Sequence, residues 1–176
     1  MGILGKPNMR SEKSYFGELM QIGKENEEVI LNWLKTFGKE ILDFREFRLA
    51  QRIDVDFGIE TIDRTIVLAE IKSDKYIREE GNFLFECNRI NHFVKDKWFY
   101  LGWGWRSPAQ KLIIRNPITN EIFVFDFLET RTIIGNYIAE IGKNLRISIV
   151  ETDKQKTTFN YLVPMQKMKY KKYLWN

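Results

Sequence analysis

The sequence predicts an α+β domain in which helices flank one mixed β-sheet. Three observations favour this class: an amphipathic helical pattern opens the chain, most other apolar residues fall into short β-rich runs, and a second helical pattern separates two of these runs. A length of 176 residues suits one compact domain, so the whole chain, 1–176, is expected to fold as a unit.

The opening helix is predicted over 14–37, where apolar residues recur at steps of three and four. Gly38 follows directly, and glycine commonly stands just past a helix end. A second helix is predicted over 128–142, with Gly142 near its end.

The strands are predicted from runs of β-branched and aromatic residues. Three such runs, at roughly 40–48, 51–60 and 64–73, predict an antiparallel meander packed on the first helix, because their connections are short. The stretch 81–90 alternates Phe83, Phe85 and Cys87 with Leu84, Glu86 and Asn88, which favours a fourth strand.

Two hairpins complete the expected sheet. The first occupies 111–127, with Asn116-Pro117 and Asn120 as turn residues between two β-rich runs. The second occupies 145–165 and has a polar tip.

Composition excludes some classes of function. The net charge of +4 permits an anionic partner without requiring one. The single cysteine, Cys87, excludes an internal disulfide, and the single histidine, His92, leaves little basis for a His-rich metal site or a Ser-His-Asp triad. Any metal is therefore expected to have oxygen ligands. No apolar run approaches the ~20 residues that cross a bilayer, so we expect a soluble cytoplasmic protein without membrane association.

The stretch "QRIDVDFGIETIDRTIVLAEIKSD" places charged residues inside two expected strands. Because residues two apart share a face of a strand, Asp54 and Asp56 are expected to point the same way, and so are Glu70 and Lys72. If the two strands are neighbours, the carboxylates meet on one face and require a cation, of which Mg²⁺ is a common choice. The alternative is that the aspartates face solvent and that Glu70 and Lys72 form a plain surface ion pair.

The order of these residues resembles the PD-(D/E)XK nuclease superfamily. An Asp, a hydrophobic strand, a turn and then Glu-x-Lys in "IVLAEIKSD" match its motif, although Ile53 or Val55 stands where the name has proline. The stretch "GKENEEVILNWLKTFG" is similar to the first helix of archaeal Holliday junction resolvases, with Glu27 as its acid four residues after Gly23.

The likeness continues through "EIKSDKYIREEGNFLFE" and "GWRSPAQKLIIRNPITNEIFVFD", which are similar to stretches of phage-type members, and covers roughly residues 16–140. It implies a restriction-endonuclease-like core. Asp54 is the closer match to the first acid, because "QRID" precedes an apolar residue, but Asp56 stays open as the principal ligand.

The resemblance implies hydrolysis of DNA phosphodiesters with Mg²⁺, for which Mn²⁺ would substitute. Asp54 or Asp56, Glu70 and the backbone carbonyl of Ile71 would hold the ion, with Glu27 nearby. Lys72 would orient the attacking water and stabilise charge on the phosphate. Asn82 and Glu86 are accessory candidates, with an outward-facing Glu86 as the alternative.

Basic residues outside the motif are candidates for nucleic-acid contact. The tail, about 165–176, interleaves lysines with aromatic residues, which suits a DNA-contacting arm; the alternative is a chain end whose rings fold back onto the core. The candidates are Lys75, Arg106, Lys167, Lys169, Lys171 and Lys172.

We therefore expect a metal-dependent deoxyribonuclease, structure-selective or resolvase-like, that acts on DNA. Enzymes of the kind it resembles often work as homodimers, but nothing in the sequence identifies a dimer face. The first alternative is a nucleic-acid-binding module of the same fold that does not cut. The second is a structural or protein-interaction domain in which the acids form surface ion pairs. The DNA structure or sequence preferred, endo or exo action, and RNA as substrate stay open.

Overall fold

The computed structural model describes residues 12–37, 40–91, 99–152 and 156–175. Its helices are α1 (Glu12–Lys35), α2 (Arg48–Arg52), α3 (Trp103–Arg106) and α4 (Phe127–Ile141). Its strands are β1 (Ile41–Asp43), β2 (Phe57–Glu60), β3 (Ile66–Ser73), β4 (Asn82–Asn91), β5 (Phe99–Leu101), β6 (Lys111–Arg115), β7 (Glu121–Asp126), β8 (Ile147–Thr152), β9 (Lys156–Pro164) and β10 (Lys171–Leu174).

The strands form two sheets rather than the single one that the sequence predicted. The larger is mixed, with strand order β1-β2-β3-β6-β7-β10, and only the β3–β6 pair in it is parallel. The smaller is antiparallel, with strand order β5-β4-β9-β8. Both edges of β3 are taken, by β2 and β6, so β4 pairs with β9 instead. The segment with β4, β5 and α3 thereby becomes the crossover that a parallel pair needs.

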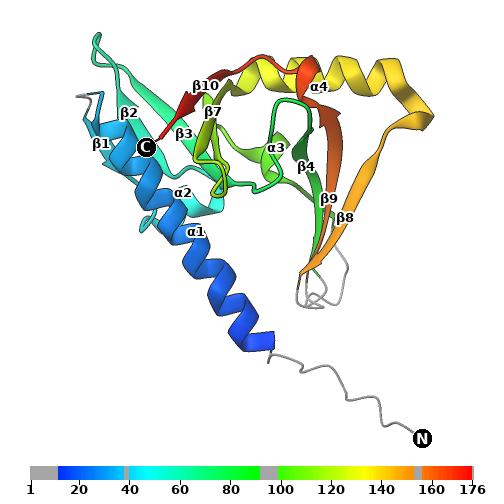
Figure 1. The fold of residues 1–176 in the computed structure, drawn as a ribbon, viewed down its shortest axis with the longest axis horizontal. Helices are drawn as coiled ribbons and strands as arrows, with labels where there is room; N and C mark the ends of the chain where they lie inside the picture. Colours follow the sequence, from blue (N-terminus) through cyan, green and yellow to red (C-terminus); the bar gives the residue numbers. More distant parts are fainter. Residues whose placement is uncertain (1–11, 38–39, 92–98, 153–155, 176) are drawn as a thin grey trace, which may run out of the picture.

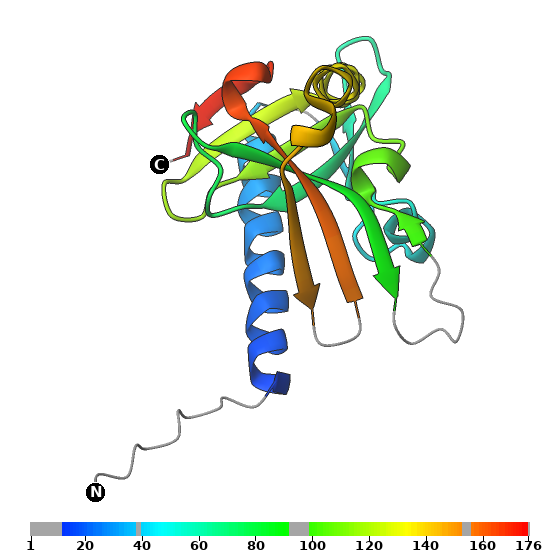
Figure 2. The same ribbon diagram turned by 90° about the vertical axis from the view of Figure 1, so that its right-hand side faces the viewer.

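Helices and the second sheet cover the two faces of the mixed sheet (Figures 1 and 2). On one face α1 buries Ile30, Trp33 and Leu34 against β-strand residues that include Ala69 and Ile71. The opposite face packs against α4 and the smaller sheet around a cluster of buried phenylalanines. The mixed central sheet with flanking helices is thus confirmed.

The predicted helices, the predicted fourth strand and both predicted hairpins are present close to their expected bounds. Gly38, proposed as the stop of the first helix, lies outside the described residues. In the turn of the first hairpin, the side chain of Asn116 accepts hydrogen bonds from the N–H groups of Ile118 and Thr119.

The predicted strand over 51–60 is wrong in its first half. The short helix α2 occupies its beginning, and Asp54 adopts a positive φ of 55° directly after it. Aspartate tolerates this left-handed backbone better than most residues. The turn ends α2 and delays the start of β2 to Phe57.

The C-terminal tail is not a free arm. Its strand β10 pairs with β7, and the ring of Tyr173 lies 5.1 Å from that of Trp33 in α1. Tyr170 packs on Phe123 and Phe125 of the core. The alternative in which the rings fold back onto the core is therefore the observed arrangement.

No helix in the described part of the chain is long and apolar enough to span a bilayer.

Candidate active site

Strand β3 presents Glu70 and Lys72 on one face, as predicted. Their neighbours Ala69 and Ile71 join the core beneath α1, so the acid and the lysine project from the opposite face of the sheet. The ammonium nitrogen of Lys72 forms an ion pair with Oε1 of Glu70, whose side chain is only 2% exposed. The pair is partly buried, because the Lys72 side chain is 32% exposed and lies over the ring of Trp103.

Asp56 lies beside this pair, directly before β2. Its backbone N–H donates to the carbonyl of Ala69, and its Oδ2 accepts a 2.7 Å hydrogen bond from the N–H of Ile71. The side chain of Asp56 thus continues the β2–β3 ladder and brings its carboxylate next to Glu70.

Burial and mutual repulsion change the acidity of this cluster. Burial, followed by the charges of Asp56 and Asp54, raises the pKa of Glu70 to about 8 despite the opposing effect of Lys72. Burial also raises the pKa of Asp56, against the effect of Lys72. Burial lowers the pKa of Lys72, but the nearby carboxylates outweigh burial and the net shift is upward. Carboxylates held this way favour an added cation or proton.

Asp54 is engaged differently from Asp56. The premise that both share a strand face is wrong, because Asp54 lies in the turn after α2. Its Oδ2 accepts hydrogen bonds from the guanidinium of Arg106, one of them 2.8 Å from Nε, and its backbone carbonyl accepts from the hydroxyl of Ser107. Its carboxylate is thus neutralised by Arg106, whereas that of Asp56 faces Glu70.

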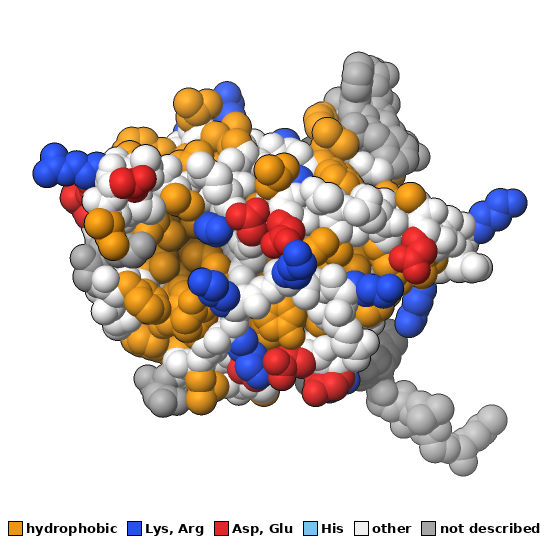
Figure 3. Space-filling view, turned by 90° about the horizontal axis from the view of Figure 1, so that it is seen from above, with side chains coloured by type: hydrophobic (Ala, Val, Ile, Leu, Met, Phe, Trp, Pro, Cys, Tyr) orange, Lys and Arg blue, Asp and Glu red, His pale blue; other side chains and the backbone are white. Residues whose placement is uncertain are grey.

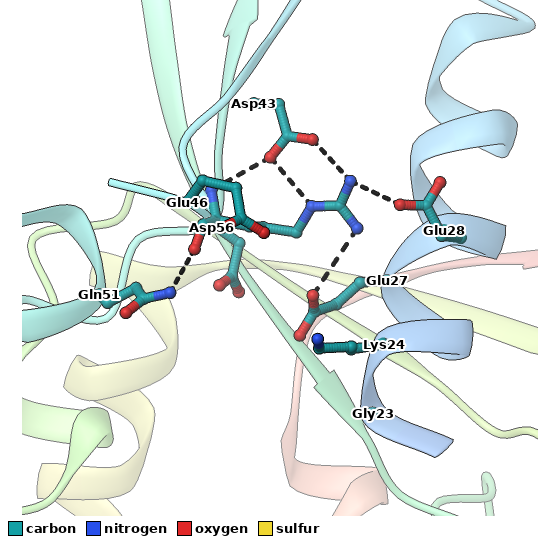
Figure 4. A pocket seen from close by; sticks show the side chains of 9 residues that line it. Gly23, Lys24, Glu27, Glu28, Asp43, Glu46, Gln51 and Asp56 are labelled. Atoms are coloured by element: carbon teal, nitrogen blue, oxygen red, sulfur yellow. Dashed lines mark hydrogen bonds and ion pairs between the residues drawn. The ribbon is translucent and has the colours of Figure 1, made fainter. Parts of the chain in front are cut away.

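Glu27 projects from α1 into a cleft of about 560 Å³ that Asp56 also lines (Figure 4). Burial and the charge of Asp56 raise the pKa of Glu27, while Arg45 and Lys72 lower it. The adjacent Asn26 is buried and donates a 3.4 Å hydrogen bond to the carbonyl of Lys72. This hydrogen bond joins α1 to the end of β3, one residue before Glu27.

Arg45 is a central residue of this cleft that sequence reasoning missed. It forms ion pairs with Asp43 and Glu28 and lies 3.7 Å from Oε2 of Glu27. Its guanidinium therefore joins acids from β1 and α1. The Asp43-x-Arg45 spacing offers no pattern that distinguishes it from an ordinary surface pair, so only the packing of α1 against β1 reveals it.

The site has oxygen donors that suit a divalent cation, but not a complete ligand cluster. No three Asp, Glu, His or Cys side chains of the described residues are grouped closely enough to hold a metal ion. Glu70 Oε2 is nevertheless buried without a hydrogen-bond partner among these residues, and the donors beside it are the hard oxygens that Mg²⁺ prefers. Asp56 and Glu70 are the pair that fits such an ion.

Among the described residues, the accessory candidates form no hydrogen bond or ion pair with Asp56, Glu70 or Lys72. Glu86 is buried rather than outward-facing; its Oε1 accepts a hydrogen bond from Arg89 and another from the N–H of Trp103. Asn82 lies at the first position of β4, opposite Pro164. Glu86 thereby joins α3 to β4.

The basic candidates are spread over different surfaces. Arg106 pairs with Asp54, and Lys75 lies over the ring of Tyr76. Three of the tail lysines have acidic partners: Lys167 with Glu140, Lys169 with Glu129, and Lys172 with Glu79 and Glu121. Figure 3 shows basic and acidic groups side by side on the face that carries α4 and β10. Lys171 is exposed, and His92 lies outside the described residues.

Comparisons with known proteins add little to this site. No family model matches the sequence, and no curated protein matches it. Among solved structures, the chain is similar to a bacterial homing endonuclease, I-Ssp6803I, at 13% sequence identity and a TM-score of 0.44. The aligned part covers 60% of this chain and 66% of that chain, slightly less than two thirds of its length. The likeness is weak, and nothing in the site described above rests on it.

Proposed function

We propose that the protein is a metal-dependent nuclease of the PD-(D/E)XK type that hydrolyses phosphodiester bonds in DNA. The observation that supports this function best is the Glu70–Lys72 pair on β3 with the carboxylate of Asp56 held beside it. A buried acid with a raised pKa next to a lysine and a second acid is an arrangement that a plain surface ion pair does not need.

In this proposal Asp56, Glu70 and the carbonyl of Ile71 hold Mg²⁺ or Mn²⁺. The bound ion would supply charge neutralisation at the scissile phosphate and lower the pKa of the attacking water. Asp54 is the alternative to Asp56 as a metal ligand; it is the less favoured of the two, because its carboxylate forms an ion pair with Arg106. Glu27 lines the open cleft beside Asp56, from which water and phosphate would reach the acids.

Lys72 has two roles in the proposed reaction. Its ammonium group orients the attacking water and stabilises the negative charge that develops on the phosphoryl oxygens. Contact with a phosphate requires it to leave Oε1 of Glu70, and its partial exposure permits that movement. We propose that the enzyme is a structure-selective or resolvase-like endonuclease and that it cuts as a homodimer.

The catalytically silent binding module stays the second candidate. Two observations favour it: the described residues contain no group of three metal-binding side chains, and Lys72 already neutralises Glu70. Such a protein would bind DNA without needing a divalent ion.

One experiment separates the two candidates. Linear, circular, single-stranded, flapped and four-way-junction DNA are incubated with the protein in Mg²⁺, Mn²⁺ or EDTA, using wild type, Lys72→Met and Lys143→Met. Lys143 is the matched control, because it is an exposed lysine in the turn after α4 and is not a candidate for metal or DNA contact. We expect metal-dependent cutting by wild type and Lys143→Met and none by Lys72→Met. Folded wild-type protein that binds DNA in EDTA but cuts no substrate would instead support the binding module.

A further inference from the structure

Helix α2 exposes an unusual combination of side chains beside the cleft. None of its residues is buried, yet it carries Leu49 at 73% exposure and is followed by Ile53 at 38%. Exposed apolar side chains that lie together commonly mark a contact surface. We call Arg48, Leu49, Arg52 and Ile53 the α2 surface.

The helical geometry orders these side chains relative to the cleft. Successive residues turn by ~100°, so positions four apart lie above one another. Arg48 and Arg52 form one row, and Leu49 and Ile53 form the next. Gln51, which lines the cleft, lies on the other side of the arginine row. The order outward from the cleft is therefore Gln51, the arginines and then the apolar pair.

The charges of the α2 surface are available to a partner. Arg48 and Arg52 are both exposed, and neither side chain forms a hydrogen bond or an ion pair with any described residue. This distinguishes them from Arg45 and Arg106, whose guanidinium groups are neutralised by acids. These two unpaired arginines are complementary to the phosphates of a polyanion that lies along the rim of the cleft, outside its acids.

From these observations we infer that the α2 surface is a DNA wedge: Arg48 and Arg52 bind backbone phosphates, and Leu49 and Ile53 insert at a base step and unstack it. Apolar side chains flanked by basic ones open base steps in this way in proteins that bend duplex DNA. The chain reaches Asp56 three residues after Ile53, so the step that is opened lies next to the acids. The inference rests on the proposed function insofar as DNA is the substrate.

The test uses the full chain and a short duplex that carries 2-aminopurine at each position in turn, in EDTA so that cleavage does not interfere. The variants are Arg48→Ala/Arg52→Ala and Leu49→Ser/Ile53→Ser, with Leu128→Ser as matched control. Leu128 is also 73% exposed on a helix, α4, away from the cleft. Thermal melts confirm that all variants are folded.

For wild type and Leu128→Ser we expect 2-aminopurine fluorescence to rise at one base step. Leu49→Ser/Ile53→Ser should lose that rise but keep the salt dependence of binding. In the double arginine variant, affinity should depend less steeply on salt: the magnitude of the negative slope of log affinity against log salt should fall by about 2. If the apolar variant matches Leu128→Ser, or if it changes only self-association or capture of a protein partner, the wedge is wrong.

The outcomes distinguish this inference from the proposed function. Local unstacking without cleavage in any metal would uphold the wedge and contradict the nuclease. Metal-dependent cleavage with unstacking unchanged in every variant would uphold the nuclease and contradict the wedge. Absence of DNA binding by the wild type in EDTA, Mg²⁺ and Mn²⁺ alike would overturn both.

Discussion

The ammonium group of Lys72 neutralises Oε1 of Glu70, while Oε2 of the same carboxylate is buried with no hydrogen-bond partner among the described residues. A buried oxygen left in this state costs free energy, because its interaction with water is lost and not replaced. Protonation of Glu70 or binding of a cation at Oε2 would remove that cost. Three of the predictions below follow from this half-satisfied carboxylate.

The stability of the protein should depend on the ionisation of Glu70. Its pKa is raised from 4.5 to about 8 in the folded state, so the folded protein binds more protons than the unfolded chain between these values. The contribution of Glu70 to stability is therefore fully present below pH 4.5 and falls as pH rises toward 8, by at most about 1.4 kcal/mol per pH unit for one proton.

Urea unfolding of wild type and Glu70→Gln at pH 6, 7 and 8 measures this effect. We expect the free energy of unfolding of wild type to decline over this range, and that of Glu70→Gln to decline less. Glu60→Gln, on the neighbouring strand β2, should follow wild type. Parallel profiles for all three proteins would contradict the prediction.

Replacing Lys72 should destabilise the fold in a pH-dependent way. Lys72 lowers the pKa of Glu70, so Lys72→Met should raise that pKa above about 8 and keep the buried Glu70 protonated to higher pH. The ion pair stabilises wild type only where Glu70 is ionised. The loss of stability should therefore be small at pH 6 and grow above pH 8, by at most about 1.4 kcal/mol per pH unit.

The double variant Glu70→Gln/Lys72→Met tests the cause of that loss. It should recover part of the stability above pH 8, because a glutamine at position 70 does not titrate. Lys75→Met is the control for removal of a lysine and should have little effect. Equal losses in the single and double variants would place the effect in packing on Trp103 rather than in charge.

Mg²⁺ should stabilise the wild-type protein at pH 8 through Asp56. Binding to the folded state alone raises the free energy of unfolding by about 1.4 kcal/mol when the ion is present at ten times its Kd. Asp56→Asn should lose this stabilisation, whereas Asp54→Asn should retain most of it, because Asp54 is bound by Arg106. Asparagine also tolerates the positive φ at residue 54.

Mg²⁺ binding is measured by thermal melts and by calorimetric titration, neither of which depends on cleavage. If Asp54→Asn loses Mg²⁺ binding and Asp56→Asn does not, Asp54 rather than Asp56 is the metal ligand. No Mg²⁺ effect on the wild type would count against a metal site at these acids.

The close packing of α3 on β4 should make Gly104 intolerant of a side chain. A Cβ at this position would lie 2.5 Å from Cζ of Phe85 and 2.7 Å from the carbonyl oxygen of Glu86. Gly104→Ala should therefore destabilise the protein by about 1–3 kcal/mol. Gly135→Ala, in the exposed middle of α4 with open space around it, should stabilise by about 0.5–1 kcal/mol. Urea unfolding that ranks the two variants in the opposite order would contradict this packing.

Local pattern alone predicted several features that the structure confirms. The helical spacing of apolar residues indicated α1 and α4, and the turn residues around Asn116 indicated the β6–β7 hairpin. The period of two along β3 placed Glu70 and Lys72 on one face. Each of these features depends on residues within a few positions of one another, where the geometry of a helix or strand leaves little choice.

Tertiary structure decided the features that depend on distant partners. The separation into two sheets follows from the competition of β2, β4 and β6 for the edges of β3. The contacts of Asp54 depend on Arg106, and the tail lysines have their acidic partners because β10 pairs with β7. Hydrophobic periodicity says which face of an element is buried but not which element covers it, because that choice is made by long-range pairing and packing.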